Sequence, residues 1–180
     1  MSPADFFQAI RDSWLATSVR ESALLYPIIL SLHLTSIAVF GGMILMTDLR
    51  LLGWALNTTP AAEVIRQLRV WKRLGFVVMV TCGILLAASK ATDYYANPYF
   101  QIKITLLLLV GVHALVFRRG VYGNPETLDS APAMPRVAKV AACLSLVLWL
   151  GIMSAGRWIA YYEKPRESQS TRTAGAAKYS

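Results

Sequence analysis

Two histidines, His33 and His113, are the residues of this chain whose type and position could do chemistry. Each lies in an apolar run, "SLHLTSIAVFGG" at 31–42 and "LLLLVGVHALVF" at 106–117. An imidazole can bind a metal such as haem iron, or it can hydrogen-bond a neighbouring helix. An ionisable side chain inside a membrane segment is by default a candidate functional residue. We therefore ask whether these runs cross a membrane and whether the two imidazoles meet.

The composition is that of a membrane protein. Hydrophobic residues make up 56% of the 180 residues and charged residues 16%, whereas soluble domains carry about 25% charged residues. The charges leave four apolar runs, near 22–47, 74–89, 104–117 and 140–156. A membrane-spanning helix needs about 20 residues, and flanking aromatic and basic residues extend the shorter runs. Because these runs lack the polar face of a soluble helix, they predict an all-α, integral membrane four-helix bundle.

Three regions are expected along the chain. Residues 1–18 predict an amphipathic helix in the membrane interface, whose apolar side carries Phe6, Phe7, Ile10 and Trp14. The transmembrane domain is expected over 19–162, with Ser18 and Glu21 as a capping box for its first span. An exposed loop rich in proline and glycine is expected between the third and fourth spans. The basic tail, 163–180, is expected to be disordered.

The basic residues that give the net charge of +8 are expected to bind the membrane surface. Nucleic acid is not the expected partner, because no soluble basic domain is present. Lysines and arginines close to the membrane are slightly more numerous in the connections between spans one and two and between spans three and four. By the positive-inside rule, both termini are then expected outside the cytoplasm.

The histidines are predicted to lie at similar depth. Spans one and three run in the same direction, and His33 lies about 11 residues into the first while His113 lies about 13 residues beyond Phe100, or about 16 and 20 Å from the same face. Such a pair could ligate one haem iron between the two helices. The alternative is that each histidine hydrogen-bonds a neighbouring helix and holds the bundle together.

The surroundings of the histidines suit a flat cofactor. Phe40 follows His33 by seven residues and shares its helix face, while Gly41, Gly42 and Gly111 are small enough for close approach of a helix or a macrocycle. Basic side chains at the helix ends could pair with the haem propionates; the candidates are Lys103, Arg157, Arg50 and Arg118. Asp48 is expected to pair with Arg50 or to cap its helix rather than to carry protons.

The segments 10–53 and 94–117 resemble an uncharacterised bacterial membrane family, and the similarity covers most of residues 5–160. The layout is more distantly similar to HemJ-type protoporphyrinogen oxidases and to CopD copper-resistance proteins. Those families share an early histidine, an F/W-x-G motif and a basic residue at the helix end, matched here by His33, Phe40, Gly42 and Arg50.

HemJ-like proteins also carry a lysine ten residues before a histidine on the third helix, matched by Lys103 and His113. The resemblance implies haem b, a multi-pass protein of the bacterial inner membrane and, by inheritance only, protoporphyrinogen oxidation. A methionine has been proposed as one axial ligand in that family, a part that Met43 or Met46 could play here. HemJ-like proteins are usually more compact and lack the N-terminal amphipathic helix and the basic tail.

Three functions follow from these patterns. The first is a membrane b-type haem protein that exchanges electrons with a quinone or a redox partner subunit. The second is copper handling, in which soft sulfur ligands join the imidazoles; the methionines available are Met43, Met46, Met79 and Met153. The third is a non-catalytic subunit that scaffolds a partner or an oligomer. Cys82 and Cys143 lie in spans two and four, where free buried thiols are expected in preference to a disulfide.

Overall fold

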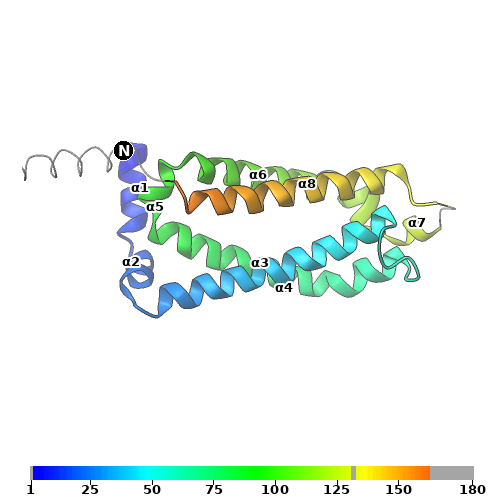
Figure 1. Ribbon diagram of the computed structural model, residues 1–180, viewed down its shortest axis with the longest axis horizontal. Coiled ribbons are helices and arrows are strands. Elements are labelled where there is room, and N and C mark those ends of the chain that lie inside the picture. The colour runs from blue at the N-terminus through cyan, green and yellow to red at the C-terminus, as the bar shows by residue number, and fades with distance from the viewer. Residues whose placement is uncertain (1, 131–132, 163–180) are drawn as a thin grey trace, which may run out of the picture.

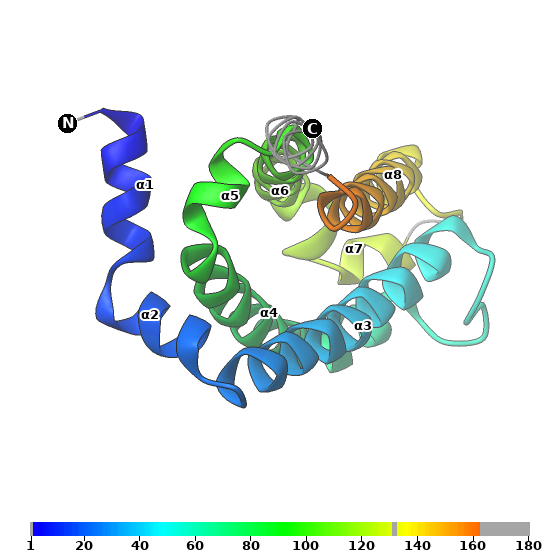
Figure 2. The ribbon, with the colours of Figure 1, turned by 60° about the vertical axis from the view of Figure 1, so that its left-hand side comes forward.

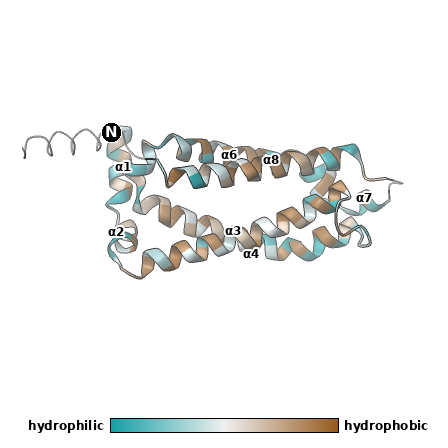
Figure 3. Ribbon diagram, in the orientation of Figure 1, coloured by the Kyte–Doolittle hydropathy of each residue, from teal (hydrophilic) through white to brown (hydrophobic). Residues whose placement is uncertain are grey.

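The computed structural model describes residues 2–130 and 133–162, and these contain helices and turns but no strand. Four helices are long: α3 (Leu25–Leu52), α4 (Ala61–Ser89), α6 (Pro98–Val116) and α8 (Arg136–Ile159). All four are long and apolar enough to cross a membrane (Figure 3). Helices satisfy their own backbone hydrogen bonds, which lipid cannot do. The predicted class is confirmed, and the chain is a multi-pass membrane protein that contacts the bilayer.

The four long helices form two antiparallel pairs. Helix α3 packs along α4, α6 packs along α8, and contacts between α3 and α8 join the pairs. Viewed towards one end, the helices form an open ring in the order α4, α3, α8, α6 (Figure 2). The short α5 (Ala91–Tyr95) connects α4 to α6 on the open side. Large parts of the spans therefore face lipid or a partner rather than this chain.

The N-terminal segment lies across one end of the bundle as two helices, α1 (Pro3–Arg11) and α2 (Trp14–Glu21) (Figure 1). Ser2 caps α1, and its hydroxyl accepts a hydrogen bond from the Asp5 amide at 3.2 Å. The expected single helix over 1–18 is thus broken at Asp12 and Ser13, and α2 continues past the expected domain boundary.

The expected capping box of Ser18 and Glu21 is wrong, because both residues lie inside α2. Helix α3 begins instead at Leu25, whose amide donates to the hydroxyl of Ser22 at 3.1 Å. By contrast, Asn97 and Pro98 start α6, with the Asn97 side chain accepting from the amides of Tyr99 and Phe100.

The connection between α6 and α8 is not the exposed loop that its composition predicts. It forms a π-helical turn, η1 (Arg118–Tyr122), and a short helix, α7 (Glu126–Asp129). Val121 and Leu128 are buried in one cluster with Leu51 of α3. The Asp129 carboxylate accepts hydrogen bonds of 2.9 Å from the amides of Ala61 and Ala62 at the start of α4. The connection therefore closes this end of the bundle; the tail, 163–180, lies outside the described residues.

Replacing Asp129 by alanine removes the cap from the first turn of α4. Loss of a helix cap costs about 1 kcal/mol, so we expect Asp129→Ala to lower the free energy of unfolding by that amount. The measurement is denaturant unfolding of the purified protein in detergent. Glu126→Ala, at an exposed residue of the same short helix, is the control, and equal stability of the two variants would contradict the cap.

Candidate functional site

Helix α4 holds the His33 ring in one orientation. The His33 Nδ1 lies 2.9 Å from the carbonyl oxygen of Met79, and because a carbonyl only accepts, Nδ1 carries the proton and donates. In the neutral ring Nε2 then keeps its lone pair. Gly83 lies beneath the ring, since a Cβ at Gly83 would be 3.0 Å from His33 Cε1. A backbone carbonyl that fixes one ring nitrogen and leaves the other available is typical of metal-binding histidines.

Lys103 of α6 extends from the opposite pair of helices. Its Nζ would lie 3.8 Å from a Cβ placed at Gly156 of α8, so the side chain extends along α8. The Lys103 charge acts on the His33 ring. Among the described residues, no acidic side chain lies within ion-pair distance of this ammonium. An unpaired cation beside an imidazole makes this part of the bundle attractive to an anionic ligand.

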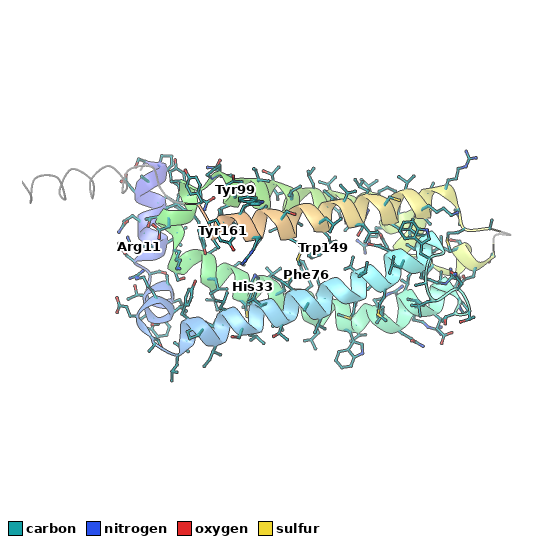
Figure 4. The ribbon with its side chains drawn as sticks, in the orientation of Figure 1. Arg11, His33, Phe76, Tyr99, Trp149 and Tyr161 are labelled. Atoms are coloured by element: carbon teal, nitrogen blue, oxygen red, sulfur yellow. The ribbon has the colours of Figure 1, made fainter. Side chains whose placement is uncertain are left out.

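Three aromatic side chains lie between this part of the bundle and its far half. The Phe40 ring centroid is 5.9 Å from that of Phe76 on α4 and 5.5 Å from that of Trp149 on α8. Figure 4 shows His33, Phe76 and Trp149 between the two helix pairs. We call Phe40, Phe76 and Trp149 the aromatic layer. It separates a polar site at the end nearer α1 and α2 from a second polar region at the end closed by α7.

The shared helix face of His33 and Phe40 is confirmed. Phe40 meets Gly75 of α4, where an added Cβ would lie 3.4 Å from Phe40 Cβ, just as His33 meets Gly83. Two side chains seven residues apart on α3 thus contact two glycines eight residues apart on α4. Glycines at these positions let the antiparallel helices approach closely.

His113 belongs to a different part of the bundle. Its Nε2 donates to the carbonyl oxygen of Ala141 on α8 at 2.9 Å, and its ring packs against Phe117 at 4.9 Å between centroids. The side chain is only 7% exposed. This histidine has the structural role that the alternative interpretation gave it, which is to hydrogen-bond a neighbouring helix.

The expected equal depth of the two histidines is wrong. Lys103, which lies near His33, precedes His113 by ten residues on α6, about 15 Å along the axis. The reason is where the helices begin: His33 is eight residues from Leu25, whereas His113 is 15 residues from Pro98. Imidazole nitrogens bind metals at about 2 Å, so the two rings as placed cannot ligate one iron.

The predicted glycines make no close contact with another helix. A Cβ at Gly41, Gly42 or Gly111 would meet nothing within 4 Å, so these positions face open space. The close approaches occur instead at Gly75, Gly83 and Gly151. Sequence spacing could not distinguish the two sets, because it does not define which face of α4 or α8 turns inward.

The other predicted basic residues are elsewhere. Arg50 lies at the far end of α3 and its Nε donates to the carbonyl oxygen of Thr59 at 2.6 Å, which secures the loop between α3 and α4. Arg118 begins η1 at that same end. Arg157, next to Gly156, is exposed and lies 4.8 Å from the Tyr161 ring centroid. Of the basic residues predicted to pair with the haem propionates, Lys103 is the one that the structure places close to His33.

Sequence reasoning missed the role of Asp48. This residue neither pairs with Arg50 nor caps the helix, but is buried inside the bundle at 1% exposure. Lys72 of α4 lies nearby and donates from Nζ to the Thr47 hydroxyl at 2.6 Å. The available signal was an acid and a lysine at the edges of two apolar runs, which resemble ordinary helix-end charges.

No group of three metal-ligating side chains of the His, Cys, Asp or Glu type exists within residues 2–130 and 133–162. Cys82 and Cys143 are free thiols, as expected. Cys82 is buried, whereas Cys143 is exposed, contrary to the expectation that both would be buried.

Substitution at Gly83 tests the orientation of His33. Alanine normally stabilises a helix by up to about 1 kcal/mol relative to glycine, and we expect this gain for Gly41→Ala, where space is open. In Gly83→Ala the new Cβ displaces the His33 ring, so the gain disappears and the ¹⁵N NMR signals of His33 shift while those of His113 remain. Equal stabilisation by both substitutions, with unchanged His33 signals, would contradict this packing.

The comparisons with known proteins give a family but no activity. No curated protein and no solved structure matches the chain, so a link to HemJ or CopD is not shown. One family model, described as a family of unknown function, DUF6644, matches residues 6–162. Because this match covers most of the chain, the protein belongs to family DUF6644.

Proposed function

We propose that the protein is a haem b redox protein of the bacterial inner membrane and that His33 is its iron ligand. One observation carries the proposal: the Lys103 ammonium, which has no acidic partner among the described residues, acts on the His33 ring that the Met79 carbonyl orients. The two residues come from α3 and α6, which are far apart in sequence. Both also match the residue pattern of HemJ-like proteins, which supports the same cofactor.

The residues around His33 and Lys103 fit a haem in type. His33 offers Nε2 as an iron ligand, and the hydrogen bond from Nδ1 to Met79 makes the imidazole a stronger ligand. Lys103 supplies a cation for a propionate carboxylate. The aromatic layer offers apolar ring faces, and Gly156 on α8, beside the Lys103 ammonium, adds no side chain of its own.

A bound haem would supply one-electron oxidation and reduction. The chain would hold the iron at His33, balance a carboxylate at Lys103 and limit the passage of water at the aromatic layer. A lipid-soluble quinone or a redox partner subunit would be the electron partner. His33 is the only histidine at this level among the described residues, so it would hold the iron without His113.

Copper handling is a weaker alternative. Met43 and Met79 are buried with Phe40 in an apolar cluster, while Met46 and Met153 are about half exposed. The structure therefore does not gather sulfur ligands around His33. A purely scaffolding subunit would use the outward faces of the helices, but it would give no reason for the oriented ring of His33 or for the unpaired Lys103.

Visible spectra of the purified protein test the proposal. After expression with ample haem, we expect a b-type spectrum that His33→Ala abolishes and His113→Ala retains. His113→Ala should cost about 1 kcal/mol of stability, because it removes only one hydrogen bond between helices. Carbon monoxide should shift the spectrum of the reduced protein, because no second histidine lies beside His33 among the described residues.

Lys103→Gln should reduce the amount of haem retained during purification several-fold, whereas Lys90→Gln should leave it unchanged. Lys90 lies at the same end of the bundle but over the Tyr26 ring, 4.9 Å from its centroid. A colourless wild-type protein would overturn the proposal. Loss of haem in both histidine variants with folding intact would instead restore ligation by the pair.

A further inference from the structure

The second polar region, at the end closed by α7, contains a carboxyl group whose environment calls for an explanation. Asp48 is 1% exposed, and its Oδ2 is the one buried side-chain oxygen or nitrogen without a hydrogen-bond partner in the described part of the chain. Native structures pair almost all such atoms. A carboxylic side chain at this depth in a membrane protein is costly to keep and marks a functional position by default.

The groups around Asp48 come from each helix packed against it. On α3 itself, Thr47 is buried and its hydroxyl donates to the Met43 carbonyl at 2.9 Å. On α4, Lys72 acts on the Asp48 charge but lies beyond ion-pair distance, since no such pair is formed. On α8, Ser145 faces the carboxyl.

The fourth neighbour is Tyr122 of η1, whose ring centroid lies 6.3 Å from that of His113. Burial raises the pKa of the Tyr122 hydroxyl above its usual range, so Tyr122 remains neutral near pH 7. His113 donates from Nε2 to the Ala141 carbonyl, and Arg69 of α4 donates to the Tyr122 carbonyl at 3.5 Å. Among the described residues, Lys72 is the cation whose charge acts on Asp48.

Two opposing effects act on the Asp48 carboxyl. Removal from water disfavours the carboxylate, and the nearby Lys72 ammonium favours it. Lys72 is half-buried, and its ammonium donates to the hydroxyl of Thr47, the residue before Asp48. Burial and the Lys72 ammonium therefore act on the Asp48 carboxyl in opposite directions.

We propose that Asp48 is an intramembrane proton-exchange site, which releases its proton to the aqueous phase at the α7 end and takes it up again, with Lys72 as the counter-charge. When the proton leaves Oδ2 for water, the carboxylate is balanced by the Lys72 ammonium. When it returns, Asp48 becomes neutral. The site lies 15 residues from His33 on α3, about 22 Å, on the other side of the aromatic layer. It requires no haem and stands apart from the proposed redox function.

Infrared titration of the detergent-purified protein tests this inference directly. We expect a carboxylic C=O band that appears as the pH falls and that shifts in D₂O because its proton exchanges with water. Asp48→Asn should abolish this band. Glu126→Gln, which removes an exposed carboxyl at the same end of the bundle, should leave it in place.

Lys72→Gln provides a second variant that keeps the Asp48 carboxyl. Without its counter-charge, Asp48 should stay protonated over a wider pH range, so the band should persist to more alkaline pH than in the wild type. The inference is overturned if no carboxyl band titrates, if the band does not shift in D₂O, or if neither Asp48→Asn nor Lys72→Gln changes it. Each readout is independent of bound haem, so failure of the redox proposal would remain distinguishable.

Discussion

Close packing of α3 against α4 at Gly75 and Gly83 fixes the positions of the groups on which any chemistry depends. Because there is no side chain at Gly83, the His33 ring can reach the Met79 carbonyl and takes up a defined tautomer. At Gly75 the same approach places Phe40 in the middle of the bundle, where Phe76 and Trp149 join it. The orientation of the imidazole and the position of the aromatic layer thus have one cause.

The bundle is divided lengthwise into two polar regions with different electrostatics. At the end nearer α1 and α2, His33 and Lys103 bring an imidazole and a positive charge. At the end closed by α7, Asp48 and Lys72 bring both signs of charge. The aromatic layer of Phe40, Phe76 and Trp149 lies between them and contains no charged group. Chemistry at one end can therefore proceed without direct contact with the other.

The fold was predictable because lipid leaves few options: long apolar runs with charged ends must be helices. Periodicity also placed His33 and Phe40 on one face of α3. What could not be predicted was register across helices. The depth of His113 relative to His33 depends on where α3 and α6 begin. These helices begin at Leu25 and Pro98, and caps rather than the apolar runs determine these starting points.

The sequence also could not show which face of each helix turns inward. Gly41 and Gly42 looked suited to close packing, yet Gly75 and Gly83 provide it. Asp48 lies one turn from the end of α3, where an acid is normally an ordinary surface charge, and only the packing of α8 and η1 shows it to be enclosed. The segment joining α6 and α8 has the composition of a loop, but it contributes Val121 and Leu128 to the core.

The cap that Asp129 places on α4 has a consequence for biogenesis. Ala61 and Ala62 emerge from the ribosome long before Asp129, which follows them by 68 and 67 residues. The first turn of α4 therefore enters the membrane before these two amides have their protein acceptor. Water or lipid headgroups must accept their hydrogen bonds until α6 has been inserted. Final closure of this end of the molecule is a late event that depends on the second helical hairpin reaching the first.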